Sequence, residues 1–255
     1  MRSLRELMDL TSRRAIVLGG GGHIGRAVAG SLDELGATLA LLDLEEPNAG
    51  DAVSLACDLA DERSTRQAVR AAIDELGGCD VLVHCAALVG TTDRAGWAVP
   101  FEQQQAAVWD EALRVNVTSA FVAAHEARDE LARDRRGSII LFGSIYGVVG
   151  PVPSLYEGRP LATPAAYAAS KGALLQLTRY LATTLAPAVR VNAVSPGGVW
   201  RDQPAEFVER YERRTPLRRM ATEEDIKGAV AFLAGDLSAY VTGHNLVVDG
   251  GWTAW

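Results

Sequence analysis

The 255-residue sequence predicts an α/β fold, a Rossmann-like doubly wound parallel sheet of about seven strands flanked by helices in a single domain. Two observations predict it. Strand-like apolar runs alternate with helical patterns along the chain, as in repeated βαβ units. The run at 80–87, Asp-Val-Leu-Val-His-Cys-Ala-Ala, is nearly continuously apolar, as expected for a strand that is buried on both faces of a parallel sheet. Residues 1–12 are expected to be an N-terminal extension.

Composition excludes several classes of partner. The net charge of -7 and the pI near 5.2 disfavour nucleic acid, which is bound through a basic surface. The apolar runs are shorter than the ~20 residues that a membrane-spanning helix needs. The first 14 residues lack the apolar core of a signal peptide, so we expect a cytoplasmic protein. Three scattered cysteines and four dispersed histidines predict no disulfide framework and no metal site.

The first predicted unit is a strand, a glycine turn and a helix. The strand 14–18 is followed by Gly19 to Gly22, then by His23, Ile24 and Gly25 and a helical pattern that runs to residue 35. The spacing Gly20-x-Gly22-x-x-Gly25 is that of a dinucleotide-binding fingerprint. Glycine permits close approach of a pyrophosphate to the backbone, and the helix N-terminus attracts an anion. A plain tight turn is the alternative.

The next predicted strand, 38–43, ends in Asp43, at about the spacing expected for the acid that binds the adenosine ribose. No arginine follows Asp43 to receive a 2′-phosphate, since the next residues are Leu44, Glu45 and Glu46. We therefore expect NAD rather than NADP. A turn residue at a strand end is the alternative role of Asp43.

The remaining elements follow the same alternation. Helices are predicted at 61–76, 102–133, 164–185 and 223–234, and strands at 53–57, 80–87, 138–142, 190–195 and 245–249. The connection 149–160 is rich in proline and glycine and is expected to be a structured loop. Three predicted elements carry polar residues of interest, which are Asn116 in the long helix, Ser144 after a strand and Tyr167 in the next helix.

Tyr167 and Lys171 are four residues apart in a predicted helix, so both side chains lie on one face. A free phenol titrates near pH ~10, and a neighbouring cation favours the phenolate. The pair therefore resembles a proton-transfer device. The same spacing also arises by chance on many amphipathic helices.

Taken together, these ordered motifs resemble the short-chain dehydrogenase/reductase family, from about Arg13 to the C-terminus. The resemblance implies that Ser144 binds the substrate oxygen, Tyr167 transfers the proton, Lys171 holds the nicotinamide ribose and lowers the pKa of Tyr167, and Asn116 supports a water-linked proton relay. It implies cofactor contacts at Gly19, Gly22, His23, Ile24, Gly25, Asp43, Asp58, Leu59, Ala86, Tyr167, Lys171, Pro196, Gly197 and Val199. It also suggests a homotetramer, or a homodimer, assembled through the helices after Glu102 and Pro164 and through the C-terminal edge.

Several positions depart from the family pattern. Leu18 and His23 stand where threonine and glycine are usual, and His84-Cys85-Ala86-Ala87 stands where Asn-Asn-Ala-Gly is usual. Arg201 stands near a position where threonine commonly contacts the nicotinamide amide. The segment 148–163 is read as an insertion that forms a wall of the substrate pocket, and 198–221 as the segment that covers the substrate.

The sequence says less about the identity of the substrate than about the reaction. The insertion and the tail 248–255 look loosely similar to members that accompany bacterial surface-sugar pathways. Arginines at 201, 210, 213, 214, 218 and 219 could recognise an anion, although a solvated helix face is favoured over an anion site. We expect oxidation of a polar sugar alcohol, with or without a phosphate or nucleotide. Reduction of a small carbonyl or 3-ketoacyl compound, and a non-catalytic NAD-binding regulator, are the alternatives.

Overall fold

The computed structural model describes residues 1–48 and 50–255. Its centre is a seven-stranded sheet in which every neighbouring pair of strands is parallel. The strands lie in the order β3 (Val53–Ala56), β2 (Thr38–Asp43), β1 (Arg14–Leu18), β4 (Val81–His84), β5 (Gly137–Phe142), β6 (Val189–Pro196) and β7 (Asn245–Val248). The predicted fold class is confirmed.

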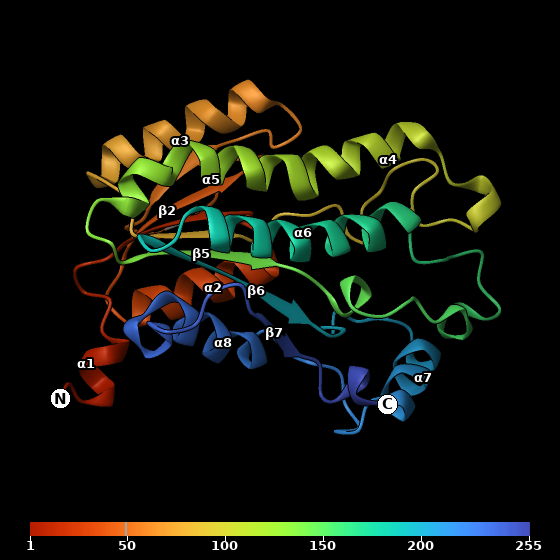
Figure 1. Ribbon diagram of the computed structural model, residues 1–255. Coiled ribbons are helices and arrows are strands. Elements are labelled where there is room, and N and C mark those ends of the chain that lie inside the picture. Colours follow the sequence, from red (N-terminus) through yellow and green to blue (C-terminus); the bar gives the residue numbers. More distant parts are fainter. Residues whose placement is uncertain (49) are drawn as a thin grey trace.

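Helices cover both faces of the sheet (Figure 1). On one face, α3 (Glu62–Leu76), α5 (Ser119–Ala132) and α6 (Ala165–Thr184) close a core that includes Ala120 and Leu174. On the other face, α2 (His23–Glu34) and α8 (Glu224–Ala234) pack together over a second core. Both faces of the central strands are therefore dry, which explains why these strands read as continuous apolar runs.

The long helix predicted at 102–133 is interrupted. It begins with a single 3₁₀ turn at Phe101–Gln103 and continues as α4 (Ala106–Leu113), a π-helical turn at Arg114–Thr118, and α5. Periodicity cannot detect such a turn, because one extra residue in a helical turn leaves the apolar pattern on both sides intact. The turn contains Asn116, so the interruption falls at a predicted site residue.

Two short helices were not predicted. Ser3 and Glu6 form a reciprocal capping box that starts α1 (Leu4–Met8). The charged segment after β6 contains α7 (Ala205–Arg214), whose exposed face carries most of its charge. In Figure 1, α7 lies beyond the carboxyl ends of β6 and β7, near the C-terminus of the chain.

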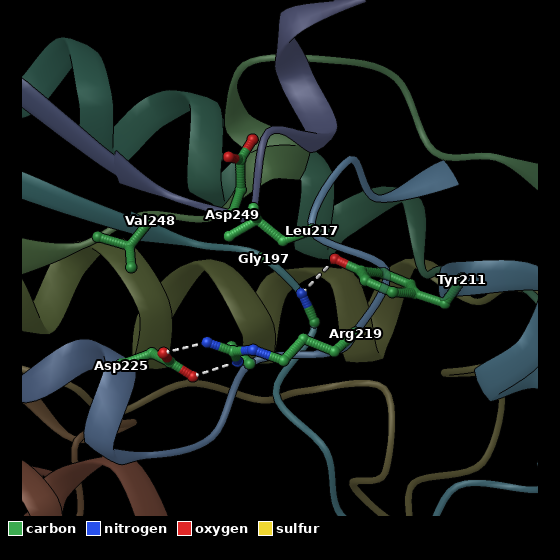
Figure 2. Close-up of a pocket in the computed structure, with 10 residues that line it drawn as sticks. Gly197, Tyr211, Leu217, Arg219, Asp225, Val248 and Asp249 are labelled. Atoms are coloured by element: carbon green, nitrogen blue, oxygen red, sulfur yellow. Dashed lines mark hydrogen bonds and ion pairs between the residues drawn. The ribbon is translucent and has the colours of Figure 1, made fainter. Parts of the chain in front are cut away.

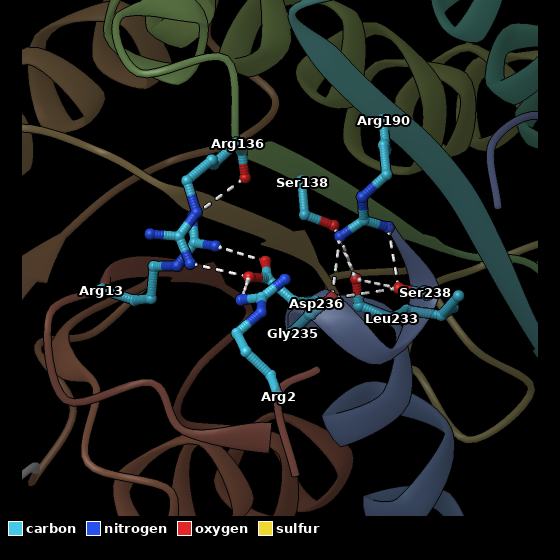
Figure 3. Close-up of polar contacts among 9 residues, drawn as sticks. All are labelled: Arg2, Arg13, Arg136, Ser138, Arg190, Leu233, Gly235, Asp236 and Ser238. Carbon is cyan, nitrogen blue, oxygen red and sulfur yellow. Dashed lines mark hydrogen bonds and ion pairs between the residues drawn. The ribbon is translucent and has the colours of Figure 1, made fainter. Parts of the chain in front are cut away.

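An arginine cluster ties the N-terminus to the edge of the sheet opposite the predicted site (Figure 3). Asp236 accepts hydrogen bonds from Arg13 and Arg136, each at 2.8 Å, and also pairs with Arg2. Next to them, Arg190 donates to backbone carbonyls at the end of α8. Burial lowers the pKa of Arg190 to about 10. One carboxylate thus anchors three arginines, two from the N-terminal region and one that directly precedes β5.

No helix in the described part of the chain, 1–48 and 50–255, is long and apolar enough to cross a bilayer. Within the same residues, no group of three or more histidine, cysteine or acidic side chains is arranged to hold a metal ion.

Candidate active site

The predicted site residues gather at the edge of the sheet where the strands end. The strands β1, β4, β5 and β6 end at Leu18, His84, Phe142 and Pro196. The strands β1 and β4 are neighbours, and the chain builds outward from them in opposite directions. In open α/β sheets, ligands bind in the crevice that such a reversal creates.

The helix α6 carries Tyr167 and Lys171 to this edge. The Lys171 ammonium lies 5.6 Å from the centre of the Tyr167 ring and donates a hydrogen bond of 2.7 Å to the Phe142 carbonyl at the end of β5. The turn after β5 packs closely on α6, since a Cβ at Gly147 would lie 2.8 Å from the Lys171 backbone. Only glycine allows this approach, which places Ser144 beside Tyr167.

The electrostatics of the pair differ from the expectation. Burial raises the pKa of Tyr167, and a hydrogen bond with Ser144 opposes this rise. Burial also lowers the pKa of Lys171 to about 8. The expected lowering of the Tyr167 pKa by Lys171 is therefore not what this arrangement produces. The physical reason is that the ammonium is directed at the Phe142 carbonyl, while desolvation of the phenol dominates.

Asn116 is fully buried in the π-helical turn. Its Oδ1 accepts a hydrogen bond of 2.8 Å from the Leu88 N–H, and its Nδ2 donates to the Ser170 hydroxyl at 2.9 Å. The side chain thus connects the segment after β4 to α6, between Tyr167 and Lys171. Ser170 was not singled out from the sequence, although its place inside the Tyr-x-x-Ser-Lys run is a signal that could have identified it.

The glycine turn is built as a close-packed strand-to-helix connection. Gly19 has φ +81°, and a Cβ there would lie 2.5 Å from the Ala86 nitrogen. A Cβ at Gly25 would lie 1.9 Å from the Gly19 carbonyl oxygen, so α2 can approach the turn only with glycine at that position. Gly22 and His23 are exposed at the start of α2, where N–H groups of the first turn have no intrahelical partner. This cradle fits a pyrophosphate.

Asp43 lies at the end of β2 against the same turn. Its carboxylate accepts hydrogen bonds from the Gly21 N–H at 2.9 Å and from the Leu44 N–H at 2.8 Å. The side chain is only half-buried. The acid is therefore held next to the glycine turn with room for a further hydroxyl donor.

The other residues proposed from the resemblance also lie near this edge, but their side chains differ in exposure. Leu59 and Pro196 are buried, Asp58 is exposed, and Ile24, Ala86, Gly197 and Val199 are half-buried. Asp58 accepts a hydrogen bond from the Ala60 N–H. Val199 forms a bridge with Ala221, which closes the segment that starts at 198.

The segment 148–163 contributes hydroxyl groups near Tyr167. It contains a 3₁₀ helix, Pro153–Tyr156, and the Thr163 hydroxyl lies 3.3 Å from the Tyr156 hydroxyl. Burial raises the pKa of Tyr146, with further increases from the phenols of Tyr156 and Tyr167 and an opposing hydrogen bond from Thr163. Phenol and alcohol groups can each donate and accept hydrogen bonds, so they suit a polar, uncharged ligand.

The arginines of 201–219 are occupied by groups of their own chain. Arg201 pairs with Glu223 at 2.9 Å, and Arg219 binds both oxygens of Asp225. Arg210 donates to the carbonyl of Glu157, at 2.8 Å, and Arg213 pairs with Glu209. The cation of Arg214 lies over the Trp252 ring, and Arg218 donates to a backbone carbonyl. These contacts favour the helix-face interpretation over the anion site.

His84 occupies the place of the first asparagine of the family pattern. It is buried at the end of β4, and its ring contacts Ser119 at the start of α5 rather than a neighbouring strand. The hydrogen bond of His84 therefore connects β4 to Ser119, the residue that follows the π-helical turn. The sequence marked His84 as a departure but could not identify its partner.

Comparisons with known proteins identify relatives that match nearly the whole chain. A family model described as enoyl-(acyl carrier protein) reductase matches residues 21–253. The 2-(S)-hydroxypropyl-CoM dehydrogenase 3 of Xanthobacter autotrophicus is 34% identical, over 93% of this chain and 95% of its own. The 4-formylbenzenesulfonate dehydrogenase of Comamonas testosteroni is also 34% identical, over 96% of this chain and 99% of its own.

Solved structures show the same fold. A short-chain dehydrogenase from Leptospira borgpetersenii with bound NAD+ superposes with a TM-score of 0.86. It is 30% identical, and the match covers 99% of this chain and 96% of that one. The two dehydrogenases named above act on different substrates at the same level of identity, so identity at this level indicates the chemistry more closely than the substrate.

Proposed function

The chain belongs to the short-chain dehydrogenase/reductase family, and from this premise we propose that it is an NAD-dependent oxidoreductase that interconverts a secondary alcohol and a ketone. The observation that carries the proposal is the meeting of Tyr167, Ser144 and Lys171 at the carboxyl edge of the sheet. A phenol and a hydroxyl that lie side by side can both contact the oxygen of an alcohol or a ketone.

Each residue of the site has a defined task in this proposal. In oxidation, Tyr167 as phenolate accepts the hydroxyl proton of the substrate, and in reduction the phenol donates it. Ser144 hydrogen-bonds the same oxygen and holds it beside the phenol. Lys171 binds the ribose hydroxyls next to the nicotinamide, and Asn116 supports a relay that returns the proton to solvent. The nicotinamide, when bound, accepts or supplies the hydride.

The cofactor is proposed to lie along the glycine turn. The close contacts at Gly19 and Gly25, the exposed start of α2 at Gly22 and His23, and the Asp43 carboxylate form a cradle of the right chemistry for NAD. The contacts of Ile24, Asp58, Leu59, Ala86, Pro196, Gly197 and Val199 with cofactor are part of the same proposal. Asp43 favours NAD because a 2′-phosphate would meet its negative charge.

The substrate is proposed to be uncharged. The pairing of the arginines removes the main support for a phosphorylated or nucleotide-linked sugar, whereas the hydroxyl groups of Ser144, Tyr146, Tyr156 and Thr163 fit a polyol or sugar alcohol. Reduction of a small carbonyl or 3-ketoacyl compound is the second candidate, because aromatic rings contribute much of the same surface. The segments 148–163 and 198–221 form the substrate side in both cases.

The proposed assembly is a homotetramer or a homodimer in the cytoplasm. Three exposed aromatic residues, Trp109 on α4, Phe121 on α5 and Tyr180 on α6, supply apolar surface on the helices that follow Glu102 and Pro164. Ala169 on α6 is also exposed, so this small residue does not face its own sheet. Multi-angle light scattering measures the assembly directly.

A substrate panel tests the proposed reaction. Sugar alcohols, their phosphates and small hydroxy compounds are assayed with NAD, and the corresponding ketones with NADH. Turnover of at least one secondary alcohol or ketone, with NAD preferred over NADP, is the expected result. Tight NAD binding with no turnover across the panel, and no effect of Tyr167→Phe on any activity, would instead support the regulator.

A further inference from the structure

Four aromatic rings connect the substrate side to the C-terminal turn. Tyr156 of the inserted segment packs on Phe207 of α7, with ring centres 5.5 Å apart, and Phe207 stacks on Tyr211 at 6.2 Å. Tyr211 stacks in turn on Trp252, at 4.3 Å with 21° between the ring planes. The row joins three segments that are far apart in the sequence. Aromatic pairs at these distances stabilise one another beyond the area that they bury.

Tyr211 also contacts the turn that follows β6. The Gly198 N–H donates a hydrogen bond of 2.5 Å to the Tyr211 hydroxyl (Figure 2). A Cβ at Gly198 would lie 2.8 Å from two ring carbons of Tyr211, and a Cβ at Gly197 would lie 2.9 Å from its hydroxyl. The ring therefore rests directly on the backbone of the two glycines, which no larger residue would permit.

The same turn is held from its other sides by backbone bonds. The Gly197 N–H donates to the Val248 carbonyl at 2.9 Å, and the Gly198 carbonyl accepts from the Ala221 N–H at 2.9 Å. A cavity of about 120 Å³ borders the turn, and the side chains of Tyr211, Arg219 and Asp249 are among its lining (Figure 2). Loss of the Tyr211 contact would thus leave the Gly198 N–H facing a space into which the turn can move.

The C-terminal turn holds the ring of Trp252 in place. The Asp249 carboxylate accepts hydrogen bonds of 2.8 Å from the N–H groups of Gly251 and Thr253. The Trp252 ring packs against Tyr211 and also contacts Arg214, whose cation lies 5.4 Å from the centre of the Trp252 ring. The turn is therefore a fixed support for α7.

We propose that Tyr211 is a positioning residue for the cofactor site, and that Trp252 acts through it. Tyr211 fixes the backbone of Gly197 and Gly198 and so holds Val199 in the position of its proposed cofactor contact. This inference rests on the proposed function, which assigns Pro196, Gly197 and Val199 to cofactor binding. It adds that residues of the C-terminal turn, which do not touch the cofactor, determine how well the cofactor binds.

The test is the affinity for NADH, measured by isothermal titration calorimetry without substrate. Tyr211→Phe keeps the ring and removes the hydroxyl, so the Gly198 N–H is left without its partner. We expect the dissociation constant for NADH to rise about three- to tenfold, the usual effect of one lost hydrogen bond. Trp252→Leu removes the stacking partner and should change the affinity in the same direction. Tyr240→Phe, at a fully exposed tyrosine, is the matched control.

Thermal unfolding of the same variants separates positioning from folding. A lower melting temperature for Tyr211→Phe with an unchanged NADH affinity would overturn the inference and leave the proposed function intact. Failure of the wild-type chain to bind NADH or NADPH would overturn both. The inference predicts that Tyr211→Phe raises the KM for NAD. The kcat should change less than about twofold, because Tyr167 and Lys171 are untouched. Should Tyr211→Phe not fold, Trp252→Phe, which keeps a ring, gives the affinity comparison.

Discussion

The Nε2 atom of His84 lies 2.7 Å from the Oγ atom of Ser119, and this contact fixes the protonation of the imidazole. The Ser119 hydroxyl donates its proton to the Val115 carbonyl, also at 2.7 Å, so its oxygen can only accept from the ring. Nε2 therefore carries the proton. Nδ1 has no partner among the described residues. His84 is thus a neutral, buried connection from β4 to the π-helical turn of Asn116.

The first prediction follows from the pKa of His84, which burial, together with the charge of Lys171, lowers to about 3. A histidine in an unfolded chain has a pKa of ~6.5. As the pH decreases from this value toward 3, the unfolded chain takes up a proton on His84 that the folded protein does not, so the free energy of unfolding falls. We expect His84→Asn to remove up to about 1.4 kcal/mol per pH unit of this slope. Urea unfolding at several pH values measures it, with the exposed His244→Asn as control. An unchanged slope would contradict the assignment.

The second prediction concerns Tyr167. Tyr167→Phe removes the proton donor and keeps the ring that packs in the site, so kcat/KM should fall about 10²- to 10⁴-fold. The dissociation constant for NADH should stay within about twofold, since chemistry and binding are separate here. Steady-state kinetics and calorimetry give the two values. Tyr180→Phe, at an exposed tyrosine of the same helix, serves as the control.

The third prediction concerns the stability cost of Lys171. The pKa of Lys171 is about 8 in the folded protein and ~10.4 in the unfolded chain. Between these two pH values the unfolded chain binds more protons than the folded protein does. The free energy of unfolding of the wild type therefore rises as the pH increases through this range. Lys171→Met lacks this rise. At pH 7 the variant should be more stable than wild type by about 1 kcal/mol or more, although inactive. Guanidinium unfolding at pH 7 and pH 10 distinguishes this result from a variant destabilised at both.

The fourth prediction concerns Asp43 and cofactor choice. Asp43→Ala removes the charge that faces a 2′-phosphate, so the ratio of kcat/KM with NAD to that with NADP should fall about 10- to 100-fold. Glu46→Ala, at a nearby exposed acid, should leave the ratio unchanged. If both variants keep the wild-type ratio, Asp43 is only a turn residue.

The fifth prediction concerns Asp236. Burial alone would raise its pKa, but hydrogen bonds from Arg2 and Arg136 reverse this effect and the net shift is downward. Asp236→Ala should destabilise the fold by about 3–5 kcal/mol, because Arg13 would remain buried without its anionic partner. Chemical denaturation measures the loss, with the exposed Asp129→Ala as reference. A loss below about 1 kcal/mol would show that the cluster contributes no more than surface pairs do.

The sequence was most informative where a residue type has one physical use. The glycines after residue 18 predict a tight turn from a strand into a helix, and the spacing of Tyr167 and Lys171 predicts a shared helical face; both hold in the structure. The apolar strands also lie where they were predicted. Strand 80–87 was predicted too long, because the N–H groups of Cys85 and Ala86 both turn to the Leu18 carbonyl.

What the sequence did not reveal depends on long-range pairing. Tyr211 was one of several aromatic residues in a charged segment, and only the fold brings it to Gly198 and Trp252. The arginines of 201–219 gave an ambiguous signal, since Asp225 and Glu223, which bind two of them, lie outside that segment. The direction of the Tyr167 pKa shift depends on burial, which one sequence does not give.

The packing of Trp252 under Tyr211 has a consequence for the order in which the protein gains its properties. The seven strands and α7 all precede Trp252 in the chain, so the sheet can form before Trp252 packs on Tyr211 and supports the turn at Gly197 and Gly198. A chain shortened between β7 and Trp252 should keep the sheet yet bind cofactor weakly. Folding and cofactor capture would then be separable events that a single aromatic contact connects.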